Sequence, residues 1–152
     1  MEEKLDIQPL IRAYNSFINM LQFAEELELK YVDEIIHAEE GARSAVIHDF
    51  EYTFELSCKM MKRYIEIEDK GEKIVSKRDL FRIAGEKELI YDFHKWVDFL
   101  EARNKTSHTY DEEIAEEVYQ IAKEFKTYVE DFITALKEHI NYDEKLKTDG
   151  EK

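Results

Sequence analysis

The sequence predicts an all-α protein, an antiparallel up-and-down four-helix bundle with one short additional helix. The 152 residues include only 4 Gly and 1 Pro against 38% charged residues, so the turn residues that sheets, sandwiches and barrels require are scarce. Apolar residues recur at alternating steps of three and four along most of the chain, which is the spacing of a helix with one buried face. The hydrophobic content of 43% is enough to bury a core without crosslinks or metals.

Two helices are predicted in the first half of the chain. The first has an apolar stripe made of Leu10, Tyr14, Phe17, Leu21 and Ala24. Pro9 fits its first turn, where a missing N–H costs no hydrogen bond. The second helix ends before Gly71, and its apolar face consists of Val46, Ile47, Phe50, Phe54, Cys58, Met61 and Ile65. The mostly charged segment 30–41 is interpreted as the end of the first helix or as a helical connection.

Three further helices are predicted in the second half. Ser76 and Asp79 match a capping box that opens a short helix ending near Gly85. Another helix runs from about Asp92 to Asn104, with Trp96, Val97 and Leu100 facing inward. The last helix has a seam made of Ile114, Val118, Ile121, Phe125, Tyr128, Phe132 and Leu136. We expect residues 1–142 to form a single domain and residues 143–152 to form a frayed polar tail.

Cysteine, histidine and glycine usage limits the chemistry. The single cysteine, Cys58, cannot form an internal disulfide, and its place on an apolar helix face indicates a buried small side chain rather than a nucleophile. None of the five histidines belongs to an H-E-x-x-H pair, and the four glycines are far apart, so neither a metal site nor a phosphate loop is predicted. The first residues lack the pattern of a secretion signal, and no apolar run approaches the roughly 20 residues that cross a bilayer. We therefore expect a reduced, cytoplasmic protein with no cofactor and no membrane contact.

The charge is large and unevenly distributed. With 36 acidic and 22 basic residues the formal charge is −14, which opposes sequence-blind adhesion to nucleic acid. Segments 1–40 and 111–131 account for much of the excess, with −7 and −6, whereas segment 59–88 carries 9 bases and 7 acids, or +2. Two interpretations of that basic segment stay open. It forms solvated helix faces, or it forms a locally basic surface for an anionic ligand.

Segment 101–111 combines basic and polar residues at the boundary between two predicted helices. Thr109 and Glu112 match a T-x-x-E capping box, which predicts that the last helix begins directly after His108. His108 would then lie beside free backbone N–H groups at a helix N-terminus, which bind phosphate. A chain reversal after Ser107 would let Arg103 and His108 converge on one anion. The alternative is a polar corner whose side chains only satisfy helix ends.

The chain contains its own control for the spacing of Arg103 and His108. Arg43 and His48 are also five residues apart, but Ala45-Val46-Ile47 between them indicates a helix entering the core, and no tyrosine follows His48 at the second position. The spacing alone is therefore a weak signal. The complete string from Arg103 to Tyr110 at a helix junction is a stronger one.

This string resembles the R-N-x-x-S-H-x-Y signature of the HEPN superfamily, in its HepT-like branch, whose small members are often named nucleotidyltransferase substrate-binding proteins. The stretch 50–56 resembles the aromatic and acidic second helix of that branch, and the similarity continues in order over most of residues 5–136. The sequence departs from the branch at Cys58, where a large aromatic is expected, and at Lys77, where a proline often opens the short helix. Both departures concern local packing.

The resemblance implies an HEPN-like bundle over residues 1–142 that forms a homodimer, with the arginine and histidine of both subunits in a shared cleft. It implies a metal-independent endoribonuclease of the toxin type. In such an enzyme His108 acts as general acid or base on the 2′-hydroxyl or the leaving 5′-oxygen, and Arg103 stabilises the charged phosphorane. The residues implied to bind the RNA substrate are Asn104, Lys105 and Ser107.

The resemblance also implies a protein partner. Tyr110 stands where HepT-like toxins accept AMP from a minimal nucleotidyltransferase, the antitoxin, and this modification adds bulk and negative charge at the RNA site. A second interpretation is a non-catalytic adaptor that presents a substrate, or Tyr110 itself, to the nucleotidyltransferase. A third is a purely structural helical dimer. The presence of both Arg103 and His108 favours the ribonuclease.

Overall fold

The computed structural model describes residues 5–29 and 36–150, and these residues form helices without any β-strand. The elements are α1 (Gln8–Glu28), α2 (Ile36–Glu68), α3 (Lys77–Glu86), α4 (Phe93–Asn104), the short 3-10 helix η2 (Thr106–His108) and α5 (Glu112–Gly150). Four long helices and the short α3 make up the predicted architecture. The all-α fold class is therefore confirmed.

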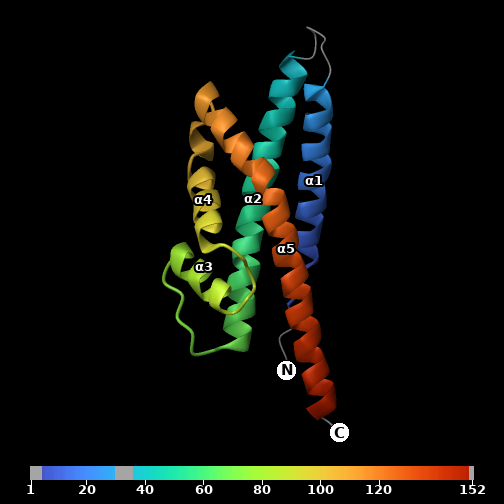
Figure 1. The fold of residues 1–152 in the computed structure, drawn as a ribbon, viewed down its shortest axis with the longest axis vertical. Coiled ribbons are helices and arrows are strands. Elements are labelled where there is room, and N and C mark those ends of the chain that lie inside the picture. The colour runs from blue at the N-terminus through green and yellow to red at the C-terminus, as the bar shows by residue number, and fades with distance from the viewer. Residues whose placement is uncertain (1–4, 30–35, 151–152) are drawn as a thin grey trace.

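The four long helices alternate in direction along the bundle (Figure 1). The chain ascends through α1, descends through α2, ascends again through α4 and descends through α5, while α3 lies beside the lower part of α2. The corner between α4 and α5 is therefore at the opposite end of the bundle from both chain termini. This placement leaves the corner open at one end of the molecule.

The ends of the first three helices follow from local sequence. Pro9 lies in the first turn of α1, as predicted. Residues 36–41 belong to α2, whereas the rest of the segment 30–41 lies outside the described residues. The Ser76 side chain accepts a hydrogen bond from the Asp79 amide at 3.0 Å and caps α3, as the capping box predicts. Hydrogen bonds from Arg82 and from the Val75 amide hold the pKa of Asp79 below its usual value.

The last helix is longer than expected. It continues to Gly150, through most of the segment for which we expected a frayed tail. Polar composition alone does not end a helix, and this segment contains good helix formers and no proline. The Tyr64 hydroxyl also donates to Asp143 at 2.7 Å, which ties the helix to α2 at the residue where the tail was expected to start.

Aromatic side chains from four helices meet in the core. Trp96 of α4 is fully buried, and its ring lies 6.2, 5.8 and 5.6 Å from those of Phe54 in α2, Phe81 in α3 and Phe125 in α5. Rings at such distances are in favourable contact and fix α4 against the other helices. Arg103 is about two helical turns after Trp96, so it lies on the face of α4 that points toward α2.

Cys58 packs into the same core from α2. It is only 5% exposed, so the predicted buried side chain is confirmed. Burial raises the pKa of Cys58 to about 12, which keeps the thiol protonated at neutral pH. A protonated, buried thiol is a poor nucleophile.

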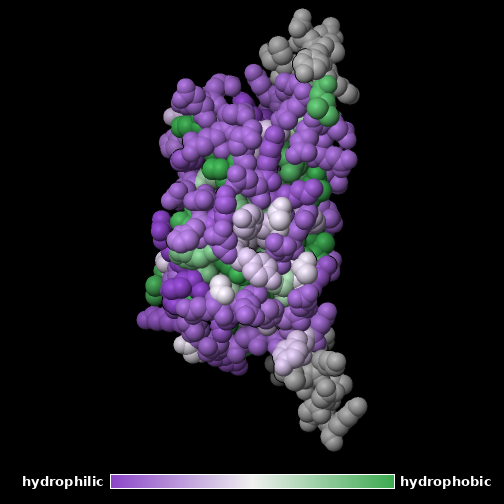
Figure 2. Space-filling view, in the orientation of Figure 1, coloured by the Kyte–Doolittle hydropathy of each residue, from purple (hydrophilic) through white to green (hydrophobic). Residues whose placement is uncertain are grey.

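The surface of the bundle is mainly hydrophilic on the face shown in Figure 2, where hydrophobic side chains appear only in small groups. The exposed large hydrophobic residues include Tyr52, Val75, Tyr91 and Tyr110. Within the described ranges, no helix is both long and apolar enough to cross a membrane.

Candidate functional site

The corner between α4 and α5 is built from local hydrogen bonds. The Lys105 amide donates to the Ala102 carbonyl at 3.0 Å and closes α4. The His108 amide then donates to the Lys105 carbonyl at 2.9 Å, which forms the single turn of η2. The Thr106 hydroxyl donates to the Arg103 carbonyl at 2.8 Å. The backbone that presents the predicted site residues is thus held by its own polar groups rather than by a buried apolar contact.

Two carboxylates of α2 hold the guanidinium of Arg103. Its Nη2 lies 3.3 Å from Glu51 Oε1, and its Nε lies 3.2 Å from Glu55 Oε1. The contact with Glu55 is an ion pair without hydrogen-bond geometry, because the buried Nε has no hydrogen-bond partner among the described residues. The Arg103 side chain is still 30% exposed. It is therefore oriented from the α2 side and accessible from the solvent side.

The same carboxylate oxygen of Glu55 also contacts a lysine. Lys77 Nζ lies 2.8 Å from Glu55 Oε1, so this one oxygen lies between two cations. Single surface ion pairs contribute little to stability, but a shared network restricts the side chains that form it. Arg103 and Lys77 together balance the charges of Glu51 and Glu55.

His108 and Tyr110 lie next to each other on the exposed side of the corner. The Tyr110 side chain is 85% exposed, and its ring lies 6.1 Å from the imidazole of His108 at an angle of 72°. Asn104 and Ser107 are also exposed. In the part of the chain that is described, the side chains of these four residues form no hydrogen bond. All four are open to a second molecule.

Lys105 is the other cation of the predicted site, and it points to α5. Its Nζ lies 2.7 Å from Glu117 Oε1, and this hydrogen bond raises the pKa of Lys105. Among the described residues, no hydrogen bond or ring contact joins Arg103 to His108. Their convergence on one anion stays a prediction, although the chain reverses direction between α4 and α5 (Figure 1).

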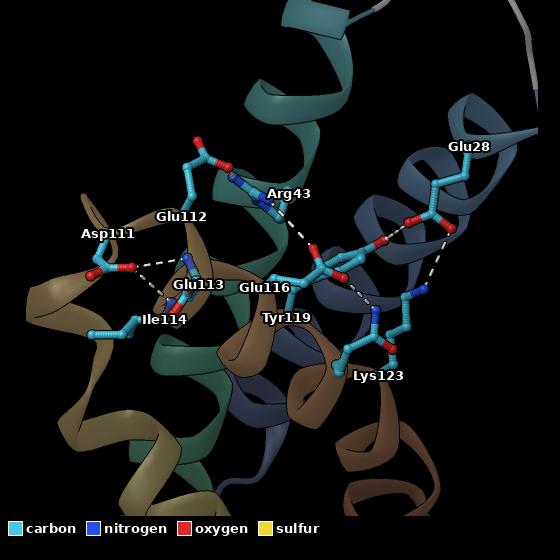
Figure 3. Close-up of polar contacts among 10 residues, drawn as sticks. Glu28, Arg43, Asp111, Glu112, Glu113, Ile114, Glu116, Tyr119 and Lys123 are labelled. Carbon is cyan, nitrogen blue, oxygen red and sulfur yellow. Dashed lines mark hydrogen bonds and ion pairs between the residues drawn. The ribbon is translucent and has the colours of Figure 1, made fainter.

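The predicted start of the last helix is wrong. The helix begins at Glu112, and the Asp111 carboxylate accepts hydrogen bonds from the amides of Glu113 and Ile114 at 2.9 and 3.3 Å (Figure 3). Thr109 does not cap the helix, since its hydroxyl donates to the Thr106 carbonyl at 3.1 Å. An aspartate caps at least as well as a threonine and its charge suits a helix N-terminus.

This cap also corrects the predicted role of the helix N-terminus. Two first-turn amides of α5 are not free, because they already bind the Asp111 carboxylate. The Asp111 carboxylate therefore occupies part of the helix end at which we expected a phosphate from sequence. The positive charge at the corner comes from side chains instead.

A second arginine is held in a similar way near the start of α5. Arg43 of α2 lies 3.1 Å from Glu112 and 3.4 Å from Glu116, between the two carboxylates (Figure 3). It lines a hollow of about 200 Å³ whose acidic residues are Glu28, Glu39, Glu40, Glu112 and Glu116. Tyr119 lies in the same hollow, and burial and its hydrogen bond to Glu28 raise its pKa. Five carboxylates make this hollow a poor place for an anion.

Glu51 and Glu55 are members of the site to which the sequence assigns no role. The available signal is a pair of acids four residues apart, which lie on one face of a helix and indicate a cationic neighbour. The chain has 22 lysine and arginine residues, so this signal does not identify Arg103. Only the packing of α4 on α2 does so.

Comparison with known proteins tests the resemblance. Residues 5–138 match the family model described as nucleotidyltransferase substrate binding protein like. The chain belongs to this family. A relative in Haemophilus influenzae named probable ribonuclease HepT is 35% identical over 103 residues, which are 66% of this chain and 70% of the relative.

Solved structures of two similar proteins agree with the family fold. One from Haemophilus influenzae, described as the fold of a substrate binding domain of a nucleotidyltransferase, has a TM-score of 0.77 and 28% identity and covers 87% of this chain and 99% of its own. Another, from Thermus thermophilus, has a TM-score of 0.60 and 25% identity and covers 79% and 98% of the two chains. The family therefore accounts for nearly the whole bundle, including the α4–α5 corner.

The chemistry open to this family member is that of the side chains at the corner. An oriented guanidinium, an imidazole and a phenol provide an anion contact, a proton acceptor or donor and a nucleophile for group transfer. The described part of the chain contains no group of three or more histidine, cysteine, aspartate or glutamate residues arranged to hold a metal ion.

Proposed function

We propose that this protein is the toxin subunit of a toxin–antitoxin pair, a metal-independent endoribonuclease whose Arg103 and His108 act in the cleft of a homodimer. We propose further that a minimal nucleotidyltransferase, the antitoxin, inhibits it by adenylylating Tyr110. The observation that carries the proposal is the order of groups at the corner. An anchored guanidinium is followed by an exposed imidazole and an exposed phenol that lie side by side.

RNA supplies its own nucleophile, so cleavage requires only proton transfer and charge stabilisation. His108 takes the proton of the 2′-hydroxyl while the 2′-oxygen forms a bond to the adjacent phosphorus. The bond between that phosphorus and the 5′-oxygen breaks, and a proton is donated to the 5′-oxygen. The products are a 2′,3′-cyclic phosphate and a free 5′-hydroxyl. Arg103 stabilises the extra negative charge of the phosphorane, because its planar donors match two phosphate oxygens.

A homodimer accounts for the second proton transfer. The base that accepts the 2′-hydroxyl proton and the acid that protonates the 5′-oxygen act on opposite sides of the phosphorus, so one imidazole does not serve both at once. In the proposed cleft one His108 acts as base and His108 of the partner subunit acts as acid. The exposure of the corner at one end of the bundle supports this assembly.

The position of Tyr110 supports the proposed inhibition. In adenylylation its oxygen attacks the α-phosphorus of ATP, the tyrosine proton is lost and pyrophosphate leaves. The product is a phosphodiester with one negative charge and an attached nucleoside. Because the Tyr110 ring lies 6.1 Å from that of His108, this group would occupy the space that the RNA phosphate needs and repel it.

An adaptor function is the second candidate. The family description and that of the Haemophilus influenzae structure both refer to substrate binding for a nucleotidyltransferase. In that function the exposed corner presents Tyr110 or a bound substrate to the partner, and His108 has no catalytic part. The two candidates differ in whether the protein alone cleaves RNA.

Replacing the corner histidine distinguishes the two candidates. His108→Ala should reduce the cleavage rate of purified protein on single-stranded RNA by about 100-fold or more, the usual contribution of a general acid–base. His48→Ala is the matched control, because His48 is exposed and follows Arg43 at the same spacing. Cleavage that His108→Ala leaves intact would eliminate the ribonuclease assignment.

The modification is tested by co-expression with a minimal nucleotidyltransferase and ATP. Mass spectrometry should find one AMP per chain, located on Tyr110 and absent from Tyr110→Phe. Tyr52 is the control, since it is 56% exposed and belongs to α2. An adduct that persists in Tyr110→Phe and disappears in Tyr52→Phe would place the acceptor elsewhere.

A further inference from the structure

A basic hollow lies between the second half of α2 and the start of α3. Its volume is about 230 Å³. Three lysines line it, Lys59 and Lys62 from α2 and Lys77 from α3, and Cys58 and Leu80 are among the apolar residues that line it. Glu55 is the only carboxylate along its described lining. The hollow therefore combines an apolar surface with a net positive wall, in a chain whose total charge is −14.

The protein compensates the charges of two of the three lysines only weakly or not at all. Lys77 is fixed, because its Nζ lies 2.8 Å from Glu55 and 5.7 Å from the centre of the Phe54 ring. Lys62 is 55% exposed, and its ion pair with Glu66 is long at 3.9 Å. Lys59 is exposed and has no hydrogen bond or ion pair within the described ranges. Such uncompensated lysines are the groups that exchange counterions for phosphates.

The hollow adjoins the catalytic arginine of the proposed ribonuclease. Glu55 Oε1 contacts Lys77 on the side of the hollow and Arg103 on the side of the corner. Glu55, Lys59 and Lys62 follow one another at steps of four and three, so they lie along one face of α2. From Glu55 to Lys62 this face extends about 10 Å at 1.5 Å per residue. A strand bound at Arg103 meets the hollow within a few nucleotides.

From this continuity we infer that the hollow binds the RNA strand beside the cleaved bond. A backbone phosphate contacts Lys59 and Lys62, and the attached ribose or base lies over the apolar residues. The inference rests on the proposed ribonuclease function and adds a binding subsite to it. It gives the basic segment 59–88 a ligand and explains how a strongly acidic protein contacts RNA along one track.

Binding is tested without cleavage by using a mixed-sequence, single-stranded RNA oligonucleotide with 2′-O-methyl groups. Fluorescence anisotropy of the full-length protein at several salt concentrations gives the affinity and its salt dependence. Lys59→Ala/Lys62→Ala should weaken binding about tenfold and reduce the slope of log K against log salt by about 0.7, the value for one lost phosphate contact on a single strand. Both lysines are exposed on a helix that tolerates alanine, so the variant should keep the helical circular dichroism of the parent.

A charge-matched control separates the hollow from general electrostatics. Lys126→Ala/Lys137→Ala removes two exposed lysines of α5 and should change the affinity by less than about twofold. Equal weakening by both double variants would overturn the inference, and so would an unchanged affinity of Lys59→Ala/Lys62→Ala. Titration of wild-type protein and of Lys59→Ala/Lys62→Ala with ATP tests whether the hollow binds a free nucleotide instead. If Lys59→Ala/Lys62→Ala loses ATP binding but keeps RNA binding, the hollow binds a free nucleotide and the inference is also overturned.

The outcomes distinguish the hollow from the ribonuclease. If wild-type protein binds the modified RNA through Lys59 and Lys62 but does not cleave unmodified RNA, the hollow stands and the ribonuclease function fails. If it cleaves RNA and the double variant binds as tightly as wild type, the function stands and the hollow fails. In a cleaving enzyme the double variant should raise KM about tenfold and leave kcat unchanged, as expected for a contact outside the reacting atoms.

Discussion

Arg43 and Arg103 have closely similar local settings in two parts of the bundle. Each stands five residues before a histidine and contacts two glutamates one helical turn apart on another helix. Each also has a buried Nε without a hydrogen bond among the described residues. The glutamates are Glu112 and Glu116 of α5 for Arg43, and Glu51 and Glu55 of α2 for Arg103.

The two arginines differ in the backbone that follows and in the charges around them. Arg43 and His48 belong to one continuous helix, so their side chains diverge by about 140° at 100° per residue. Between Arg103 and His108 the chain leaves α4 and makes η2. The hollow at Arg43 is lined by five glutamates, whereas the hollow beside Arg103 has three lysines and one glutamate. The five-residue spacing between arginine and histidine and a pair of carboxylates therefore do not define an anion site. The end of a helix between the two residues and the local charge do.

The largest expected difference between the two arginines is in RNA cleavage. Arg103→Ala should reduce the cleavage rate by about 100-fold or more, because the charge of the phosphorane loses its fixed counter-charge. Arg43→Ala should stay within about threefold of wild type, since its surroundings repel RNA. Arg103→Lys should recover only part of the rate, as lysine lacks the planar fork.

Stability measurements show whether Arg43→Ala and Arg103→Ala disturb the fold to the same extent. Each alanine variant removes one side chain that bridges two carboxylates, so both should lower the unfolding free energy by similar amounts of about 1 kcal/mol. Urea unfolding followed by circular dichroism measures this change. If Arg43→Ala lowers the cleavage rate as much as Arg103→Ala at equal stability, the α4–α5 corner is not the site of cleavage.

The arrangement of helices could be predicted from sequence because it depends on apolar periodicity. Trp96 and Phe125 lie on stripes that repeat with the helical period, and both are fully buried. Ser76 was identifiable as a cap because its partner Asp79 is three residues away. The capping rule gave the wrong residue where two residues could cap the same helix. At the start of α5 both Thr109 and Asp111 precede acidic residues, and the backbone selects Asp111.

The environment of the site residues could not be predicted, because it depends on contacts between distant segments. Arg103 and Glu51 are separated by fifty-two positions and meet only when α4 packs on α2. The string from Arg103 to Tyr110 identified the corner itself, since those residues are adjacent in sequence. Whether a lysine such as Lys105 is free or paired depends on which glutamate of α5 faces it.

The glutamates offer a smaller and more selective test of the same comparison. Glu51→Gln/Glu55→Gln should lower kcat about tenfold, because the guanidinium of Arg103 is less well oriented. KM should fall at the same time, since two negative charges near the RNA are removed. Glu112→Gln/Glu116→Gln makes the same charge change around Arg43 and should leave kcat unchanged. A parallel loss of kcat in both variants would show that charge alone, and not orientation of Arg103, is being measured.

The start of α5 provides the smallest effect and tests the end of the corner. Asp111→Ala leaves the amides of Glu113 and Ile114 without their acceptor, so the unfolding free energy should fall by about 1 kcal/mol and Tm by about 2–4 °C. Thr109→Ala removes a hydroxyl that only contacts the Thr106 carbonyl and should cost less. Differential scanning calorimetry of the two variants gives the order directly. If Thr109→Ala is the more destabilising change, Thr109 is the cap in solution, α5 begins directly after His108, and the helix N-terminus returns as a phosphate site beside that histidine.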